Sequence, residues 1–194
     1  MQEKTFYVCS YGGSGSHMLC DALAKYGKVE HIHSRKPPDK LTYIGKNEGG
    51  NTYWEWFNNI PIPENKLKNY YVIYIYRNPS FSIPSRFTMR DHLQHIQINK
   101  DIKLGDVLSS GKDLYKIKEF YDNYTIPNKK RNYKIFCVKY EDIFEKQDEL
   151  SNLLNIGKLN LVNKSSRKNT DKRLDIIYAD LIDEMGKNNF IIIS

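Results

Sequence analysis

The sequence predicts a single α/β domain over residues 1–194, built as three αβα layers around a central parallel sheet. Short β-forming runs at residues 6–9, 29–33, 70–76 and 132–140 alternate with helical stretches, and this alternation is typical of parallel sheets. The third run, YYVIYIY, is almost unbroken in apolar and aromatic residues, as expected for a strand buried on both faces. A chain of 194 residues can bury one full core.

Charge and hydropathy narrow the classes of partner. The formal charge is +7, and charges of both signs are spread along the chain. A small polyanion such as a nucleotide accounts for this surplus, and a nucleic-acid partner is not required. No apolar run approaches the roughly 20 residues of a membrane span, and residues 1–4 lead directly into the first strand without a signal peptide. We therefore expect a cytoplasmic protein with no membrane partner.

The three cysteines do not form a recognisable framework. Cys9, Cys20 and Cys137 are odd in number and widely spaced, and the first and last fall inside predicted strands. This pattern favours reduced cysteines that pack in a core over disulfides or a zinc site.

The first strand, at residues 6–9, leads into a glycine-rich turn at residues 11–16 and a helix at residues 17–24. Backbone N–H groups and the positive end of the helix dipole point into such a turn, which makes it an anion site. Ser14 and Ser16 add hydroxyl donors. The alternative is a tight β-to-α connection that binds nothing.

The turn is not a Walker A loop, because no Lys precedes Ser16, and chemistry driven by ATP or GTP is therefore disfavoured. It resembles instead the phosphosulfate-binding loop of the PAPS-dependent sulfotransferases, with the pattern Thr/Ser-Tyr-Pro-Lys/Arg-Ser-Gly-Ser/Thr. The sequence SYGGSGS follows that pattern except at two glycines, which replace the proline and the basic residue. The resemblance implies a P-loop-like first βα unit whose nucleotide-binding residues are Tyr11, Gly12, Gly13, Ser14, Gly15, Ser16 and His17.

A second part of the resemblance follows the strand at residues 70–76. Arg77 opens an Arg-Asn-Pro turn, and Ser85 lies eight residues further on. Sulfotransferases have an Arg and a Ser at this spacing after a core strand, and in that family the pair holds the 3′-phosphate of PAPS. A guanidinium at the carboxyl end of a strand can donate two hydrogen bonds to a phosphate. The alternative is a turn without a ligand.

The histidines of the second strand supply the predicted catalytic group. Strand alternation places His31 and His33 on one face. The pair is open to three interpretations: metal ligands, surface residues or a catalytic base. The context of His33 is similar to the Lys-Thr-His-Leu-Pro segment of cytosolic sulfotransferases, which implies a base at His33 or His31. His92 and His95 are expected at the surface.

Gly13 stands where the family places a cation that neutralises charge on the leaving phosphate. Loss of such a group typically slows an enzyme by about 10²–10³-fold. The candidates to replace it are His17, Lys36 and Lys46.

The remaining segments carry weaker signals. Residues 53–57 are expected to form a short helix on the sheet or to line an acceptor pocket. Helices are also predicted at residues 113–124 and 171–185, and Pro84 is expected near a helix start at Ser82 or Ile83.

Acidic residues and a basic loop complete the pattern. Glu141 and Asp142 resemble the Tyr-Glu-Asp-Leu segment of the family and are expected to be structural, opening a helix. Arg167 and Lys168 resemble the basic loop that closes over the nucleotide.

Taken together, the resemblance implies a sulfotransferase that moves a sulfuryl group from PAPS, leaving PAP, to a hydroxyl or amine of an unidentified acceptor, without a metal. A glycan, a tyrosyl peptide and a small alcohol all fit as acceptors. Two alternatives stay open: a catalytically degenerate PAP(S)-binding module, and a P-loop kinase-like phosphotransferase.

Overall fold

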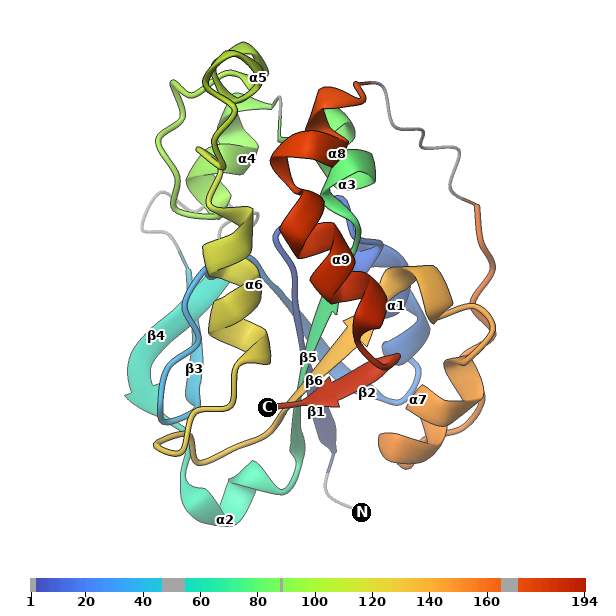
Figure 1. Ribbon diagram of the computed structural model, residues 1–194. Helices are drawn as coiled ribbons and strands as arrows, with labels where there is room; N and C mark the ends of the chain where they lie inside the picture. Colours follow the sequence, from blue (N-terminus) through green and yellow to red (C-terminus); the bar gives the residue numbers. More distant parts are fainter. Residues whose placement is uncertain (1–2, 47–54, 88, 165–170) are drawn as a thin grey trace.

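A central sheet of five strands organises the computed structural model, which describes residues 3–46, 55–87, 89–164 and 171–194 (Figure 1). The strand order is β2-β1-β5-β6-β7. The bounds are Lys4–Cys9 for β1, Gly27–Ile32 for β2, Tyr70–Tyr76 for β5, Ile135–Lys139 for β6 and Ile191–Ile193 for β7. The first four strands are parallel, which confirms the α/β class with a mostly parallel sheet.

The sheet departs from the prediction at β7, which pairs antiparallel with β6. The backbone N–H of Lys139 bonds the carbonyl of Phe190 at 3.0 Å, so the chain enters β7 beside the carboxyl end of β6. From that point it can only run back along β6, and the last strand is therefore an antiparallel edge strand.

The strand order reverses around β1. The chain passes from β1 to β2 on one side and returns to β5 on the other, so β1 and β5 are neighbours although residues 10–69 lie between them in the sequence. Ligands of open α/β sheets bind at the carboxyl ends of the strands where the order reverses. The turn after β1 and Arg77 after β5 both lie at this place.

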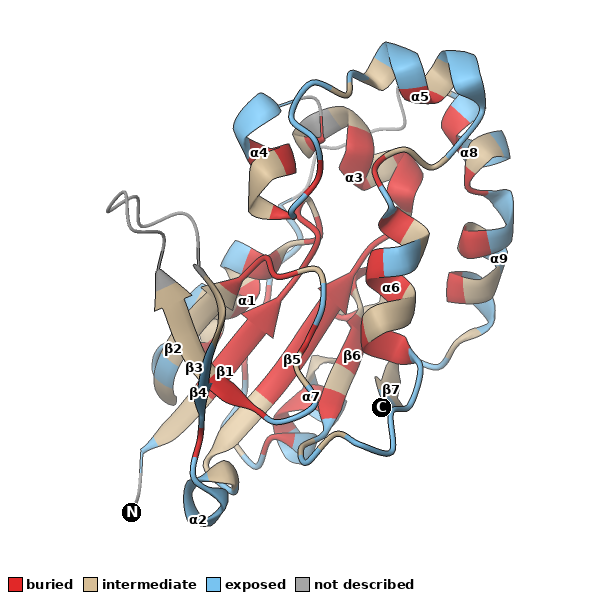
Figure 2. Ribbon diagram, turned by 90° about the vertical axis from the view of Figure 1, so that its left-hand side faces the viewer, coloured by how far each residue is buried: buried red, intermediate tan, exposed pale blue. Residues whose placement is uncertain are grey.

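Alternation along the strands fills two cores. In β5, Tyr74 and Tyr76 enter one apolar cluster, whereas Ile73 and Ile75 enter the other. Cys9 and Cys137 are buried and free, as predicted. The most deeply buried positions follow β1, β5 and β6 (Figure 2).

Helices cover both faces of the sheet. The face with Ile73 packs against α1 and α7, and the face with Tyr74 packs against α3, α6, α8 and α9. Their bounds are Ser16–Leu23 for α1, Pro79–Arg86 for α3, Ile117–Thr125 for α6, Gln147–Leu153 for α7, Arg173–Ile177 for α8 and Ala179–Lys187 for α9. This is the three-layer arrangement that the sequence predicts. None of the helices that the structure describes is long and apolar enough to cross a membrane.

Smaller elements complete the fold. Helices α4 and α5 stand beyond the carboxyl ends of the strands, and an antiparallel hairpin lies beside the sheet near β2 (Figure 2). The bounds are Thr42–Lys46 for β3, Glu55–Pro61 for β4, Glu64–Leu67 for α2, Arg90–His95 for α4 and Leu104–Ser110 for α5.

Four local predictions were wrong. Residues 55–57 begin β4 instead of a helix, because their β-favouring aromatic residues pair with β3; residues 53–54 lie outside the described part of the chain. Helix α3 begins at Pro79 because the Asn78 side chain accepts from the N–H of Ser80 at 2.9 Å, so Pro84 lies inside it.

The predicted helix at residues 171–185 is two helices, α8 and α9, which meet at Tyr178. Tyr178 leaves helical geometry there, with φ −107° and ψ 18°. Glu141 and Asp142 belong to a 3-10 turn, Tyr140–Asp142, and the next helix begins only at residue 147.

Candidate functional site

The turn between β1 and α1 is shaped by glycines. Gly12, Gly13 and Gly15 have φ angles of 97°, 69° and 80°, a region that other L-residues rarely adopt. A Cβ on Gly15 would lie 2.5 Å from a ring carbon of Tyr140. The loop therefore requires glycine for both its conformation and its close contacts.

Hydroxyl groups connect this loop to β2. The N–H of Gly12 donates to Ser10 Oγ at 3.3 Å, and Ser10 Oγ donates to Ser16 Oγ at 3.1 Å. Ser16 Oγ lies 2.8 Å from His31 Nε2 and can donate a hydrogen bond to that nitrogen. His31 therefore positions Ser16 at the first turn of α1.

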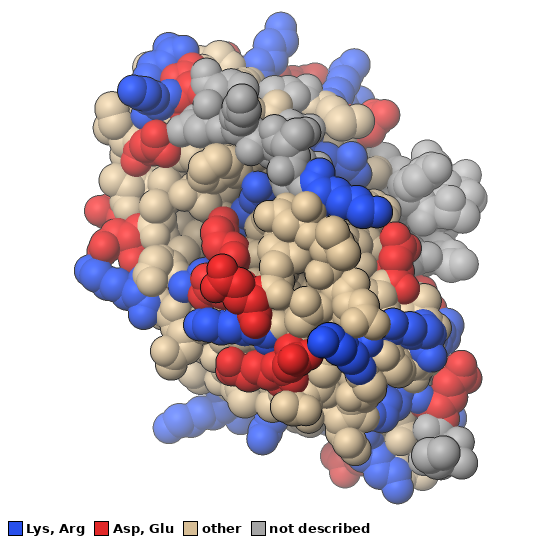
Figure 3. Space-filling view, turned by 90° about the vertical axis from the view of Figure 1, so that its right-hand side faces the viewer, with Lys and Arg blue, Asp and Glu red and all other residues tan. Residues whose placement is uncertain are grey.

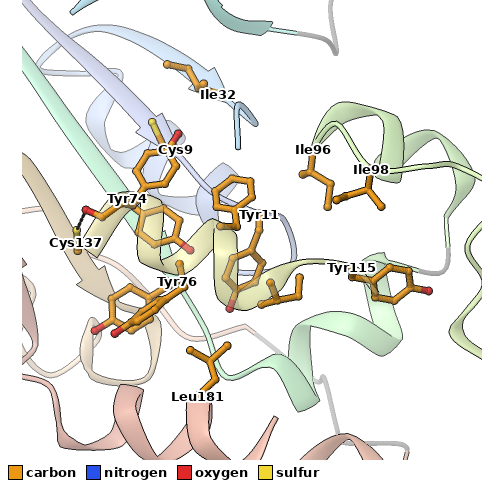
Figure 4. Packing of buried hydrophobic residues seen from close by; sticks show 14 of the residues in the cluster. Cys9, Tyr11, Ile32, Tyr74, Tyr76, Ile96, Ile98, Tyr115, Cys137 and Leu181 are labelled. Atoms are coloured by element: carbon orange, nitrogen blue, oxygen red, sulfur yellow. Dashed lines mark hydrogen bonds between the residues drawn. The ribbon is translucent and has the colours of Figure 1, made fainter. Parts of the chain in front are cut away.

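Tyr11 points away from the loop opening. Its ring is fully buried and packs against Tyr74, Phe87 and Phe120, with centroids 5.9–6.3 Å apart (Figure 4). The Tyr11 hydroxyl bonds the backbone of Arg77. Of the predicted loop residues, Tyr11 therefore contributes its ring to the core and only its backbone to the loop.

Arg77 is held by stacking. The residue is only 8% exposed, and its guanidinium carbon lies 4.3 Å from the ring centroid of Tyr140 and 5.6 Å from that of Phe81. The turn that follows is fixed because the N–H of Asn78 donates to Glu141 Oε1 at 2.9 Å. This contact gives Glu141 a structural role, which differs from the predicted one of opening a helix.

A cavity of about 670 Å³ opens in front of Arg77, within the range of ~300–1,000 Å³ typical of ligand pockets. It extends from the loop along α1 to residues 159–164. The lining residues are Gly15, Met18, Asp21, Ala22, Lys25, Arg77, Tyr140, Leu159, Asn160, Leu161, Val162 and Lys164. Over the described part of the side that bears α7, acidic and basic side chains are interspersed (Figure 3).

A second, smaller cavity of about 110 Å³ adjoins the first at Gly15. The rest of its lining comes from the loop, α1, the end of β2 and α3, namely Gly12, Gly13, Ser16, His17, His31, His33 and Arg86. The predicted catalytic histidines and the predicted anion loop therefore meet in one place.

All five histidines of the chain form one cluster here. The His31 ring lies 4.5 Å from that of His17 and 4.4 Å from that of His33, and His33 lies 5.6 Å from His92 and 6.1 Å from His95. The prediction that His92 lies at the surface was wrong, whereas His95 is half-buried. His92 is 2% exposed because α4 folds over the loop, where His92 Nε2 reaches the carbonyl of Tyr11 at 2.7 Å.

A hydrogen bond fixes the tautomer of His33. His33 Nδ1 lies 2.8 Å from the carbonyl of Ser10, which can only accept, so Nδ1 carries the proton and Nε2 keeps its lone pair. Burial lowers the pKa of His33 to about 4 and that of His92 to about 3, and burial with the neighbouring His33 lowers the pKa of His31 to about 2. These rings are neutral at pH 7.

Other predicted residues are placed differently. Ser85 lies in the last turn of α3, but its side chain lies outside the described part, as do Arg167, Lys168 and the side chain of Lys46. Lys36 lines a separate cavity with Pro38 and Lys130, away from the loop.

Sequence reasoning missed Arg86, which lines the small cavity. The signal was its position in the last turn of the helix that follows Arg77, which directs a long side chain back toward the strand ends.

Within the described ranges, no three His, Cys, Asp or Glu side chains come together in a group that could hold a metal ion.

Comparison with protein-family models, with curated proteins and with solved structures finds no match.

Proposed function

We propose that this protein is a PAPS-dependent sulfotransferase with a P-loop-like first βα unit. One observation carries the proposal: the carboxyl ends of β1 and β5 bring the glycine loop and Arg77 to a single cavity of about 670 Å³. Two anion-binding elements on one cavity suit a nucleotide that carries phosphates at both ends of its ribose.

In this proposal, the residues that line the cavity bind PAPS in one orientation. Stacking on Tyr140 orients the Arg77 guanidinium, and a guanidinium is the group best suited to bind the 3′-phosphate through two hydrogen bonds. The loop N–H groups and the first turn of α1 suit the 5′-phosphosulfate. The apolar side chains of Leu159 and Leu161 offer a surface for the adenine ring of the nucleotide.

His33 is the base in this proposal. Its Nε2 lone pair is available because Nδ1 donates to Ser10, and the ring lines the small cavity. The acceptor oxygen forms a bond to sulfur and gives its proton to His33 Nε2. The bond between sulfur and the 5′-phosphate oxygen breaks, and the electron pair goes to the phosphate of PAP. His31 acts through Ser16 and does not compete for this proton.

A thermal-shift titration with PAP tests the proposal, with ATP plus Mg²⁺ as the comparison and Arg77→Ala as the variant. A ligand that binds only the native state raises Tm with concentration. We expect PAP to raise Tm, ATP–Mg²⁺ to leave it unchanged, and Arg77→Ala to remove the PAP effect. A shift with ATP–Mg²⁺ alone would overturn the proposal in favour of a kinase-like protein.

A further inference from the structure

A permanent cation from outside the loop faces the small cavity. Arg86 is the last residue of α3 and is half-buried, and it is the one Lys or Arg among the described residues that line this cavity. With the residues that the structure describes, its guanidinium makes no ion pair. A half-buried cation beside a cavity and without a carboxylate partner favours an anionic ligand.

The groups around Arg86 do not offset its charge. His31, His33, His92 and His95 all have a pKa lowered from the usual value, chiefly by burial and in part by the positive charge of Arg86. The acidic side chain near His95 is Asp91, which is exposed on α4. His31 and His33, which line the cavity with Arg86, are therefore neutral, and neither ring offsets the charge of Arg86.

The glycine loop after β1 leaves space for the side chain of Arg86. A Cβ on Gly12 would lie 2.3 Å from His92 Cε1 and 3.2 Å from Arg86 Cγ. The space beside Gly12 is thus already filled by side chains from α3 and α4. Gly12 makes room for the stem of Arg86, and Gly13 leaves the cavity without a cation of its own.

From this geometry we propose that Arg86 binds the 5′-phosphate and the transferring sulfuryl group of the donor, replacing a basic residue in the loop. The proposal rests on the proposed function. Arg77 binds the 3′-phosphate in the large cavity and Arg86 the 5′-phosphate in the small one, with Gly15 at the junction of the two. As the sulfur–oxygen bond breaks, Arg86 stabilises the charge that develops on the phosphate of PAP.

Nucleotides that lack one of the two phosphates distinguish the role of Arg86 from that of Arg77. The test measures Kd by calorimetry for PAP, for 5′-AMP, which lacks the 3′-phosphate, and for 3′-AMP, which lacks the 5′-phosphate. The variants are Arg86→Ala, Arg86→Gln, which keeps most of the stem, and Arg77→Ala. Arg90→Ala is the charge-matched control, because Arg90 is exposed and pairs with Asp101 at 3.2 Å.

We expect Arg86→Ala and Arg86→Gln to weaken the binding of PAP and of 5′-AMP at least tenfold and to leave the binding of 3′-AMP unchanged. Arg77→Ala should do the reverse, weakening PAP and 3′-AMP but not 5′-AMP, and Arg90→Ala should bind as wild type does. If the Arg86 variants bind 5′-AMP as tightly as wild type while Arg77→Ala still loses PAP, the role of Arg86 is overturned and the proposed function stands. If wild type binds none of the three nucleotides, the proposed function itself fails.

Discussion

The hydroxyl of Tyr11 holds both backbone polar groups of Arg77: it accepts from the N–H at 3.0 Å and donates to the carbonyl. Tyr11 belongs to the loop after β1, and Arg77 follows β5. One buried side chain therefore fixes the distance between the two predicted anion-binding elements, and it does so through the core.

Tyr11→Phe removes this connection and is expected to destabilise the fold. The buried N–H and carbonyl of Arg77 would lose their partner, at a cost of about 2–4 kcal/mol in the free energy of unfolding. PAP binding should weaken as well, because Arg77 is no longer held relative to the loop. Urea denaturation and a PAP titration measure the two effects.

The matched control is Tyr76→Phe. The Tyr76 hydroxyl is buried in the same core, and no described residue bonds it. Its removal is expected to be neutral or slightly stabilising. Equal losses in the two variants would show that the hydroxyl of Tyr11 has no special role.

Gly15→Ala is expected to disturb both cavities. A side chain there is strained at a φ of 80°, and its Cβ would lie 2.5 Å from the Tyr140 ring on which Arg77 stacks. We expect a loss of about 2 kcal/mol or more in stability and at least a tenfold loss of PAP affinity. Gly105→Ala in α5 is the control: a Cβ there meets nothing within 4 Å, so this change should slightly stabilise the helix. A Gly15 variant that behaves like the Gly105 variant would contradict the loop geometry.

The tautomers of the two buried histidines can be observed directly. His33 should carry its proton on Nδ1 and His92 on Nε2, because each nitrogen donates to a backbone carbonyl. Long-range ¹H–¹⁵N correlation spectra distinguish the two forms. We expect both rings to stay neutral from pH 8 to about pH 5, since their pKa values are about 4 and about 3. A His33 ring that titrates near pH 6.5, or that carries its proton on Nε2, would remove the assigned base.

Stability should fall as the pH falls. Unfolded histidines have a pKa near 6.5, whereas burial lowers the pKa of His33 and His92 in the folded protein, so below pH 6.5 the unfolded chain binds more protons. Each ring then destabilises the fold by up to about 1.4 kcal/mol per pH unit until its folded pKa is reached. Unfolding midpoints between pH 7.5 and 5 measure the slope. His92→Gln, which keeps a donor for the carbonyl of Tyr11, should reduce it, and a slope unchanged in this variant would refute the contribution of His92.

The sequence was informative where local chemistry decides the structure. The run at residues 70–76 matches β5 in full, and the glycine turn begins where β1 ends. Alternation also placed His31 and His33 side by side. These features depend on neighbours in the chain, which a sequence displays.

The features that the sequence left hidden depend on tertiary packing. His92 and Arg86 are distant from the loop in sequence, and only the fold of α3 and α4 brings them to Gly12. The polar pattern around His92 is typical of a surface helix, whereas its ring is buried by a contact with the Tyr11 carbonyl. The antiparallel direction of β7 likewise follows from where α9 ends.

A crystal structure with PAP would locate both phosphates relative to Arg77 and the glycine loop. We expect the 3′-phosphate within hydrogen-bond distance of the Arg77 guanidinium, the 5′-phosphate on the glycine loop beside Arg86, and the adenine against residues 159–162. A nucleotide bound in the opposite direction, or bound away from Arg77 and the loop, would contradict this expectation.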